Sequence, residues 1–306
     1  MKKILLIVLI TFGINVSAET IRLVVPFAQG GGGDQLARVM QKHLVQDLHK
    51  TVIVELRPGA STEIGTAVVA NADPKDLVLL MNSPSIIINS LTKDKLSYSE
   101  SNLTPLIHLG YVPFILVVSK KSGIKTFKDL QNIDSNRPIM YGSSGPATGT
   151  HLSGAVLQKS LGKNFIHVPY KGSGQAIPDL ISGNIDMLLI HWTAVSQYVE
   201  SGQITALAIE SDHRLKQLPT VPTFKEFGIP NVGQHGYIVI FSNVTTETVL
   251  QNQVKKSLLK MVNDPDKNNP YLALGYIKEK DPTVVQDYFK TEKQRYSKIL
   301  QNTRLD

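Results

Sequence analysis

A run of four glycines is the feature of this sequence that is best suited to binding chemistry. The stretch PFAQGGGGDQLAR (26–38) places Gly30 to Gly33 between a short apolar run and a helical pattern. The first N–H groups of a helix have no partner inside the helix and lie at the positive end of its dipole. Glycines let the chain turn sharply and leave no side chain between those N–H groups and a ligand. The stretch therefore predicts an anion-binding turn, with a merely tight turn as the alternative.

Two nucleotide motifs do not fit these glycines. No Gly-Lys-Ser/Thr follows them, which excludes the phosphate-binding Walker loop. Gln35 stands where the dinucleotide fingerprint needs its third glycine. The run therefore contains neither nucleotide-binding motif, and the predicted anion is bound in another way.

Three further turns share the same design. The stretches 141–154 (YGSSGPATGTHLSG) and 168–189 (VPYKGSGQAIPDLISGNIDMLL) run from a strand through small and hydroxyl residues into a helix. The stretch 79–85 (LLMNSPS) ends a strand with serines. Because ligands of open α/β sheets bind at the carboxyl ends of strands, four such turns predict a shared cleft for a small acid. Ser144, Thr148 and Ser173 could instead be helix caps and nothing more.

Charged residues near these turns have structural explanations beside functional ones. Asp34 is expected to cap the helix or to fix the glycine loop, with a ligand amino group as the alternative partner. Asp186 stands near a strand start and is expected to accept bonds from loop N–H groups; facing the cleft, it could select an amino acid or a protonated acid. Lys171 is expected at the surface, where it could steer anions without touching them.

The only tryptophan, Trp192, follows directly on the strand-like run IDMLLI (185–190) and His191. This position is the end of a predicted strand that faces the cleft. The ring is expected either to pack under the next helix or to form a flat wall of the pocket, with its N–H available to an oxygen. As a wall it would favour a planar or short acid over a bulky tricarboxylate.

Composition and the N-terminus predict export. The start MKK, the apolar run ILLIVLITF (4–12) and Val16-Ser17-Ala18 have the form of a secretory signal peptide over residues 1–18. No later stretch is long and apolar enough to span a bilayer. The absence of cysteine fits a bacterial periplasm better than a disulfide-rich extracellular module. The net charge of +7 comes from scattered basic residues, which argues against nucleic-acid binding.

Strand-like and helix-like patterns alternate along the rest of the chain. This alternation predicts an α/β fold with largely parallel sheets. A long amphipathic pattern at 281–300 predicts a helix near the C-terminus. The strand-like runs are 21–25, 51–55, 77–81, 114–119, 138–142, 165–170, 185–190 and 205–210.

An ordered set of four stretches, 26–38, 52–74, 167–189 and 206–230, resembles the Bug-type receptors. These are the extracytoplasmic solute-binding proteins of tripartite tricarboxylate transporters, and the resemblance covers essentially the whole chain after residue 18. It implies a two-domain type II periplasmic binding fold with mixed, largely parallel sheets joined by a two-strand hinge. Domain 1 would comprise 19–117 and 236–306, with the C-terminal helices packed on it, and domain 2 would comprise 118–235.

The resemblance also implies the ligand and the partners. Ligands of the family are mostly small carboxylic acids, gripped by backbone N–H groups, hydroxyls and waters rather than by arginine. A monomeric receptor is expected to pass such an acid to membrane transporter subunits, without cofactor, metal or nucleic acid. Carried over residue by residue, and with Trp192 added from its position, the ligand contacts are expected to be Pro26, Phe27, Ala28, Gly31, Gly32, Gly33, Asp34, Asn82, Ser83, Ser85, Ser143, Ser144, Gly145, Thr148, His151, Tyr170, Lys171, Gly172, Asp186 and Trp192.

Two other functions stay open at this point. A receptor of the same fold could serve a sensor kinase or act alone in signalling. A hydrolase is disfavoured because 142–146 reads GSSGP rather than Gly-x-Ser-x-Gly, and because the chain has neither His-Glu-x-x-His nor cysteine. A Ser–His–Asp group assembled from distant positions remains an alternative. The ligand itself is left open among citrate, a dicarboxylate, an amino acid, nicotinate and a terephthalate-like acid.

Overall fold

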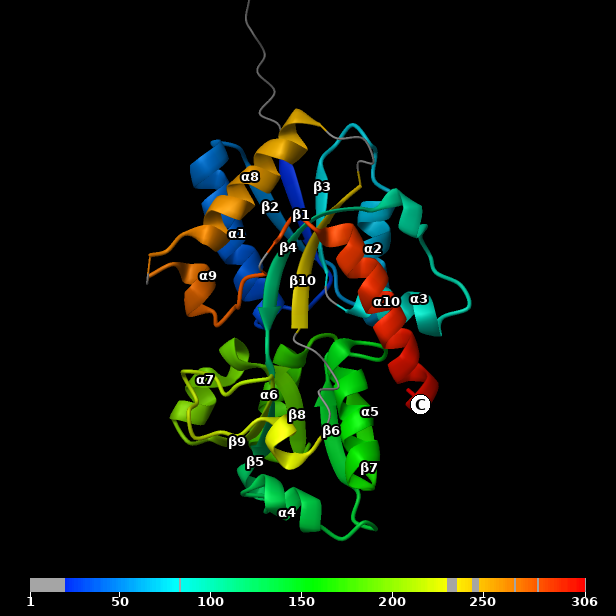
Figure 1. The fold of residues 1–306 in the computed structure, drawn as a ribbon, viewed down its shortest axis with the longest axis vertical. Helices are drawn as coiled ribbons and strands as arrows, with labels where there is room; N and C mark the ends of the chain where they lie inside the picture. Colours follow the sequence, from blue (N-terminus) through cyan, green and yellow to red (C-terminus); the bar gives the residue numbers. More distant parts are fainter. Residues whose placement is uncertain are drawn as a thin grey trace, which may run out of the picture.

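The chain folds into two α/β domains, one above the other in Figure 1. The computed structural model describes residues 20–82, 84–229, 236–243, 248–266, 268–279 and 281–305, so the expected signal peptide lies outside the described residues. The strands are β1 (Ile21–Val25), β2 (Val52–Leu56), β3 (Val78–Asn82), β4 (Thr104–Val112), β5 (Phe114–Ser119), β6 (Ile139–Ser143), β7 (Phe165–Pro169), β8 (Met187–His191), β9 (Ile204–Glu210) and β10 (Gly236–Ser242). The helices are α1 (Gly32–Leu48), α2 (Glu63–Ala70), α3 (Ser85–Thr92), α4 (Phe127–Asn132), α5 (Gly149–Leu161), α6 (Ile177–Ser182), α7 (Trp192–Glu200), α8 (Val249–Asn263), α9 (Pro270–Ala273) and α10 (Val285–Asn302).

Each domain is built on a five-stranded mixed sheet. The first has the order β2-β1-β3-β10-β4 and the second β7-β6-β8-β5-β9. In the first, β1 pairs in parallel with β2 and β3, whereas β10 runs antiparallel to β3 and β4. The second sheet repeats this scheme, with β6 parallel to β7 and β8 and with β5 antiparallel to β8 and β9. The two-domain type II periplasmic binding fold is thereby confirmed.

The repeated scheme gives the two domains equivalent helices. Strand β1 leads into α1 and then β2, just as β6 leads into α5 and then β7. Strand β8 leads into α7, as β3 leads into α3. The carboxyl ends of parallel strands lie at one edge of a sheet, so the helices that follow them begin at that edge. Helices α1 and α5 therefore begin at corresponding places in their domains.

The chain crosses between the sheets earlier than the sequence indicated. Strand β4 belongs to the first sheet and β5 to the second, and only Pro113 separates them. The whole of 114–119 thus lies in the second sheet, and the crossing falls before the expected boundary after residue 117. The return crossing leads into β10, and residues 230–235 before it lie outside the described residues.

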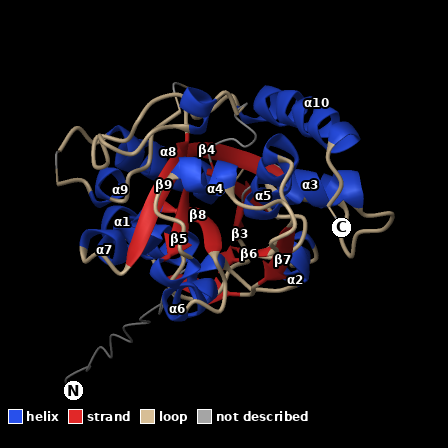
Figure 2. Ribbon diagram, turned by 90° about the horizontal axis from the view of Figure 1, so that it is seen from below, coloured by secondary structure: helices blue, strands red, loops and turns tan. Residues whose placement is uncertain are grey.

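Apolar residues pack on both faces of each sheet. The first sheet separates two buried clusters that include Leu23 and Leu80, and the second separates two that include Leu116 and Leu188. Figure 2 shows helices on all sides of the strands. The C-terminal helices lie on the first domain, with α8 against α1 and β4 and with α10 against α3 and β4 (Figure 1). No helix in the described ranges is long and apolar enough to cross a membrane.

Asn243 fastens the end of the returning strand β10 to the rest of the first sheet. Its Oδ1 accepts a bond from Val78 N–H at 3.0 Å, and its Nδ2 donates to the carbonyl oxygens of Asp73 and Asp76, each at 3.0 Å. The residue is 5% exposed, so water cannot replace these partners. One side chain thus satisfies three backbone groups at the start of β3.

We expect Asn243→Asp to lower the free energy of unfolding by about 2–3 kcal/mol, because a carboxylate cannot donate to the two buried carbonyls. Urea denaturation measures the change. Asn136→Asp is the matched control, since Asn136 is exposed, and it should change stability by less than about 0.5 kcal/mol. Equal effects of the two substitutions would contradict this role of Asn243.

Candidate functional site

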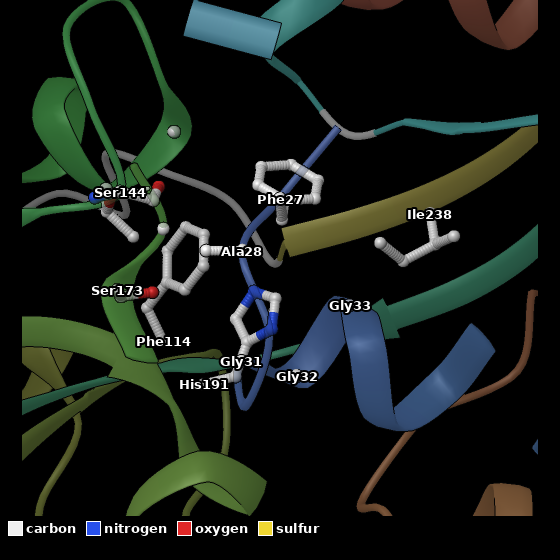
Figure 3. A pocket seen from close by; sticks show the side chains of 13 residues that line it. Phe27, Ala28, Gly31, Gly32, Gly33, Phe114, Ser144, Ser173, His191 and Ile238 are labelled. Carbon is white, nitrogen blue, oxygen red and sulfur yellow. Dashed lines mark hydrogen bonds between the residues drawn. The ribbon is translucent and has the colours of Figure 1, made fainter. Parts of the chain in front are cut away.

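A cavity lies between the two domains at the strand ends where α1 and α5 begin (Figure 3). The first domain contributes the loop after β1, the start of α1 and one residue of β10. The second contributes the starts of β5 and α5, the turn after β7 and the end of β8. The lining residues are Phe27, Ala28, Gly31, Gly32, Gly33, Phe114, Ser144, Gly149, Thr150, Gly172, Ser173, His191 and Ile238.

The N-terminus of α1 reaches the cavity as bare backbone. Its N-cap is Gly31, which makes no side-chain cap bond, and Gly32 and Gly33 form the first helical positions. Their N–H groups are among those that no helical carbonyl accepts, and they lie at the positive end of a seventeen-residue helix. Asp34 lies behind them and fixes the loop, because its Oδ2 accepts a bond from Gly30 N–H at 3.1 Å. The glycine run thus presents backbone N–H donors to the cavity, whereas the carboxylate of Asp34 is bonded to the loop.

The N-terminus of α5 reaches the same cavity from the second domain. Thr148 is its N-cap and accepts a bond from His151 N–H, which leaves Gly149 and Thr150 at the cavity as the first helical residues. Thr150 Oγ1 accepts a bond from Ser144 N–H at 2.9 Å and lies 2.8 Å from Ser144 Oγ. A pair of hydroxyls therefore accompanies the positive end of this helix.

Among the residues that the structure describes, His191 is the only ionisable side chain that lines the cavity. It ends β8 and is the N-cap residue of α7, and its ring stacks on Phe114 with centroids 4.8 Å apart and planes at 12°. Burial lowers the pKa of His191 to about 4. The imidazole is therefore neutral at physiological pH and offers one donor and one acceptor.

The described lining of the cavity therefore offers dipoles instead of charged side chains. None of the lining residues in the described part of the chain is Lys, Arg, Asp or Glu. Its donors are the N–H groups of two helix ends and the hydroxyls of Ser144, Thr150 and Ser173, while Phe27 and Phe114 supply flat apolar surface. N–H groups at helix N-termini favour anions, and aromatic rings pack against carbon. Within the described residues, no group of three acidic or histidine side chains is placed to hold a metal ion.

Backbone atoms of the two domains touch at one side of the cavity. Ala28 N–H donates to the carbonyl oxygen of Lys171 at 3.1 Å. Gly174 lies so close to the glycine loop that a Cβ there would be 2.9 Å from Gly31 N and 3.0 Å from Gly30 C. The cavity that remains measures about 40 Å³, which is less than the roughly 300–1,000 Å³ of small-molecule pockets. The structure thus describes a closed arrangement, and a larger ligand requires the domains to separate.

Part of the site expected from the sequence is brought together here. Phe27, Ala28, Gly31, Gly32, Gly33, Ser144 and Gly172 all line the cavity. They come from the glycine loop of the first domain and from two turns of the second. Three of the four turns that were expected to share a cleft reach this cavity, whereas the described residues of 79–85 do not line it.

Expected residues of the first domain that do not line the cavity have structural partners. Pro26 packs close to Gly65 of α2, and Asp34 holds the glycine loop. Asn82 is completely buried and donates to Thr66 Oγ1 at 3.0 Å, while Ser85 is buried at the start of α3. Ser83 lies outside the described residues.

In the second domain, four expected residues build the loop before α5 from within. Ser143 Oγ accepts a bond from Gly145 N–H at 3.0 Å, and Thr148 Oγ1 donates to Gly145 O at 2.6 Å. His151 Nδ1 accepts a bond from Ala147 N–H at 3.1 Å. These side chains shape the loop, and none of them lines the cavity.

The remaining expected residues are turned away from the cavity. Tyr170 donates its hydroxyl to Asp179 at 2.6 Å, and the side chain of Lys171 is exposed. Asp186 precedes β8, at the end of the strand opposite His191, and its Oδ2 accepts a bond from Met140 N–H at 2.9 Å. Trp192 is 5% exposed and belongs to an apolar core cluster of the second domain. The ring that reaches the cavity belongs to His191, because the chain turns from strand to helix between these two residues.

Sequence reasoning missed Phe114, Gly149, Thr150, Ser173, His191 and Ile238. Three of them could have been found, because Gly149, Thr150 and Ser173 lie inside glycine-rich turns that were already recognised. Phe114, His191 and Ile238 lie in apolar strands whose pattern predicts burial and gives no sign of a cavity. Only the pairing of β5 with β8, which places Phe114 opposite His191, brings two of these rings together.

Comparisons with known proteins agree with this architecture. Residues 36–303 match the model of the tripartite tricarboxylate transporter family receptor. A UPF0065 protein from the tcbD-tcbE intergenic region of Pseudomonas sp. (strain P51) is 29% identical over 295 residues, covering 94% of this chain and 88% of that protein. Protein BugT of Bordetella pertussis is 32% identical over 218 residues, covering 70% and 67%. The structure of R. palustris Rpa4515 with adipate has a TM-score of 0.87 at 25% identity, covering 94% of this chain and 98% of that one.

We expect Gly174→Ala to shift the ligand-free protein toward an open arrangement, because the new Cβ would meet backbone atoms of the other domain that cannot move alone. Gly31→Ala is the matched control, since its Cβ would have only ordinary contacts at 3.8 and 3.9 Å. The chain has no cysteine, so Lys42→Cys and Ser182→Cys, both at exposed positions, carry spin labels uniquely. Double electron–electron resonance should give a longer distance between the two spin labels in Gly174→Ala than in the wild type or in Gly31→Ala. The same label distance in all three proteins would contradict the close contact between Gly174 and the glycine loop.

Proposed function

Because the chain belongs to the tripartite tricarboxylate transporter receptor family, we propose that it captures a small carboxylate between its domains in the periplasm and delivers it to a membrane transporter. Capture takes place where the glycine loop and α1 of one domain meet the N-terminus of α5 of the other. The acid is bound unchanged and released unchanged.

The observation that carries this proposal is the convergence of two helix N-termini on one cavity. Gly32 and Gly33 from α1 and Gly149 and Thr150 from α5 line it together. Each end attracts a carboxylate through N–H groups and the helix dipole, and partial burial raises the stabilisation toward about 2 kcal/mol. Since the ends belong to different domains, an acid that touches both also favours closure.

The chemistry of the lining residues limits the class of ligand that the cavity suits. An ammonium group would need an anionic partner, and none of the described residues that line the cavity is acidic. The rings of Phe27 and Phe114 instead suit a carbon skeleton. An acid without an amino group is therefore favoured over an amino acid. The adipate of the R. palustris relative is an acid of this class.

Binding requires opening and reclosure. The closed cavity is too small for an acid of that size, so the loops that carry Ala28 and Lys171 must part before the acid enters. The strand crossing at Pro113, between β4 and β5, joins the domains and is a place where such a motion can be absorbed.

A hydrolase is less consistent with the geometry. Ser143 Oγ lies 2.6 Å from His167 Nε2, which is the spacing of a nucleophile and its base. However, Ser143 is completely buried and does not line the cavity, and its hydroxyl also bonds with Gly145. A substrate carbonyl cannot approach it without unfolding the loop. The pair is better explained as part of the loop's support.

A thermal-shift screen tests the proposal with matched ligands. Adipate should stabilise the protein, by about 2.7 kcal/mol at about 100 times its dissociation constant. 2-Aminoadipate should bind more weakly, because its ammonium group finds no acidic partner among the described residues of the cavity. Other carboxylates and their amino derivatives, such as succinate and aspartate, extend the comparison.

The proposal fails if no carboxylate stabilises the protein, or if the amino derivatives stabilise it as well as the parent acids. Calorimetry on the best acid should give one site per chain. Hydrolysis of a test ester at a rate above that of Ser143→Ala would point to an enzyme instead.

A further inference from the structure

Two histidines hold the β6–α5 loop from the side away from the cavity. His151 Nδ1 accepts a bond from Ala147 N–H at 3.1 Å. His167 Nε2 lies 2.6 Å from Ser143 Oγ. Between these attachment points lies Ser144, which lines the cavity. The two imidazoles are thus joined to both ends of a loop that reaches the candidate ligand.

The loop adopts a conformation that its residues do not favour by themselves. Gly145 has φ = 127° and Ala147 has φ = 50°. The left-handed region is costly for alanine because of its Cβ, so the surroundings must impose it. The bond from Ala147 N–H to His151 is one such constraint, and the bond from Gly145 N–H to Ser143 Oγ, at 3.0 Å, is another.

The rings are themselves fixed by packing. His151 and His167 stack with centroids 3.8 Å apart and planes at 9°. The ring centroid of Tyr141 lies 5.0 Å from that of His167, and the Tyr141 ring also lies close against Gly154 of α5. His151 is 3% exposed. Rings held in this way keep their nitrogen atoms at defined places relative to the loop.

We propose that His151 and His167 are positioning residues for ligand binding: through Ala147 and Ser143 they fix the loop that presents Ser144 and the N-terminus of α5 to the acid. This inference rests on the function proposed above. It gives His151 a role through the loop, in place of the direct contact that the sequence suggested.

Burial keeps both rings neutral. The groups that face them are Tyr141 from β6, Lys159 from α5 and Arg304 from the C-terminal segment, which line with them a second cavity of about 320 Å³. Within the described part of the chain, no acidic side chain lines that cavity. Burial lowers the pKa of His151 to about 3, with a further contribution from His167, and burial lowers the pKa of His167 to about 4. His151 Nδ1 therefore keeps the lone pair that accepts from Ala147 down to acidic pH.

Matched substitutions separate positioning from general stability. His151→Leu removes the acceptor, whereas His151→Asn replaces Nδ1 by an amide oxygen. His167→Leu and His167→Gln form the corresponding pair at the second ring. Ser153→Ala on α5 is the control, because its buried hydroxyl has no hydrogen-bond partner among the described residues.

Hydrogen exchange in the ligand-free protein measures directly how well the amides of the β6–α5 loop are protected. We expect the Ala147 amide to exchange about tenfold faster in His151→Leu, as for the loss of one net hydrogen bond, and His151→Asn to restore most of the protection. The Gly145 amide should respond in the same way to His167→Leu and His167→Gln. Wild-type protection of Ala147 should be constant from about pH 8 to about pH 5 and fall below about pH 4. Amides of β5 and β8 should not change.

Calorimetry with adipate measures how the substitutions change the affinity for the acid. The two leucine variants should bind about tenfold more weakly, and Asn, Gln and Ser153→Ala should stay within about threefold of the wild type. Unchanged exchange in the leucine variants would overturn the proposal, as would equal losses of affinity in the leucine and amide variants. If the wild type bound no acid, the proposed function would fail, while the exchange data would still decide whether the histidines fix the loop.

Discussion

The structure depends on the direct approach of backbone to backbone across the two domains. Ala28 N–H donates to Lys171 O, and Gly174 lies so close to the glycine loop that it leaves no room for a side chain of its own. This contact brings the N-terminus of α1 opposite that of α5. Glycine is required in the turn after β7, because a Cβ at Gly172 would lie 3.0 Å from Ala28 N and one at Gly174 would lie 2.9 Å from Gly31 N.

An uncharged cavity is the consequence of this arrangement. The donors are fixed dipoles of the backbone and a few hydroxyls, and His191, the one ionisable ring among the described lining residues, is neutral because burial lowers its pKa to about 4. Dipoles that are already oriented cost little reorganisation when an anion arrives. Charged residues stay in supporting positions: Asp34 holds the glycine loop, and Asp186 lies at the far end of β8.

Much of the fold could be predicted from the sequence because most strands are short apolar runs between turn residues. The run 21–25 was predicted and forms β1, and 114–119 forms β5. Strand β4 was missed because Pro105, His108 and Gly110 interrupt its apolar pattern. These residues have a weak intrinsic preference for a strand, and pairing with β10 stabilises the strand conformation. The glycine turns of the site could be predicted because backbone exposure has a compositional signature. The aromatic walls could not, since Phe114 and His191 face the cavity only through strand register and Trp192 is turned into the core.

The central claim is that one acid is held by helix ends of both domains. Amide chemical shifts of ¹⁵N-labelled protein, followed during titration with the acid that stabilises it most, test this claim directly. We predict saturable shifts with one common dissociation constant at Gly32 and Gly33 of α1 and at Gly149 and Thr150 of α5. Shifts confined to one helix end, or to exposed lysines such as Lys171, would contradict it.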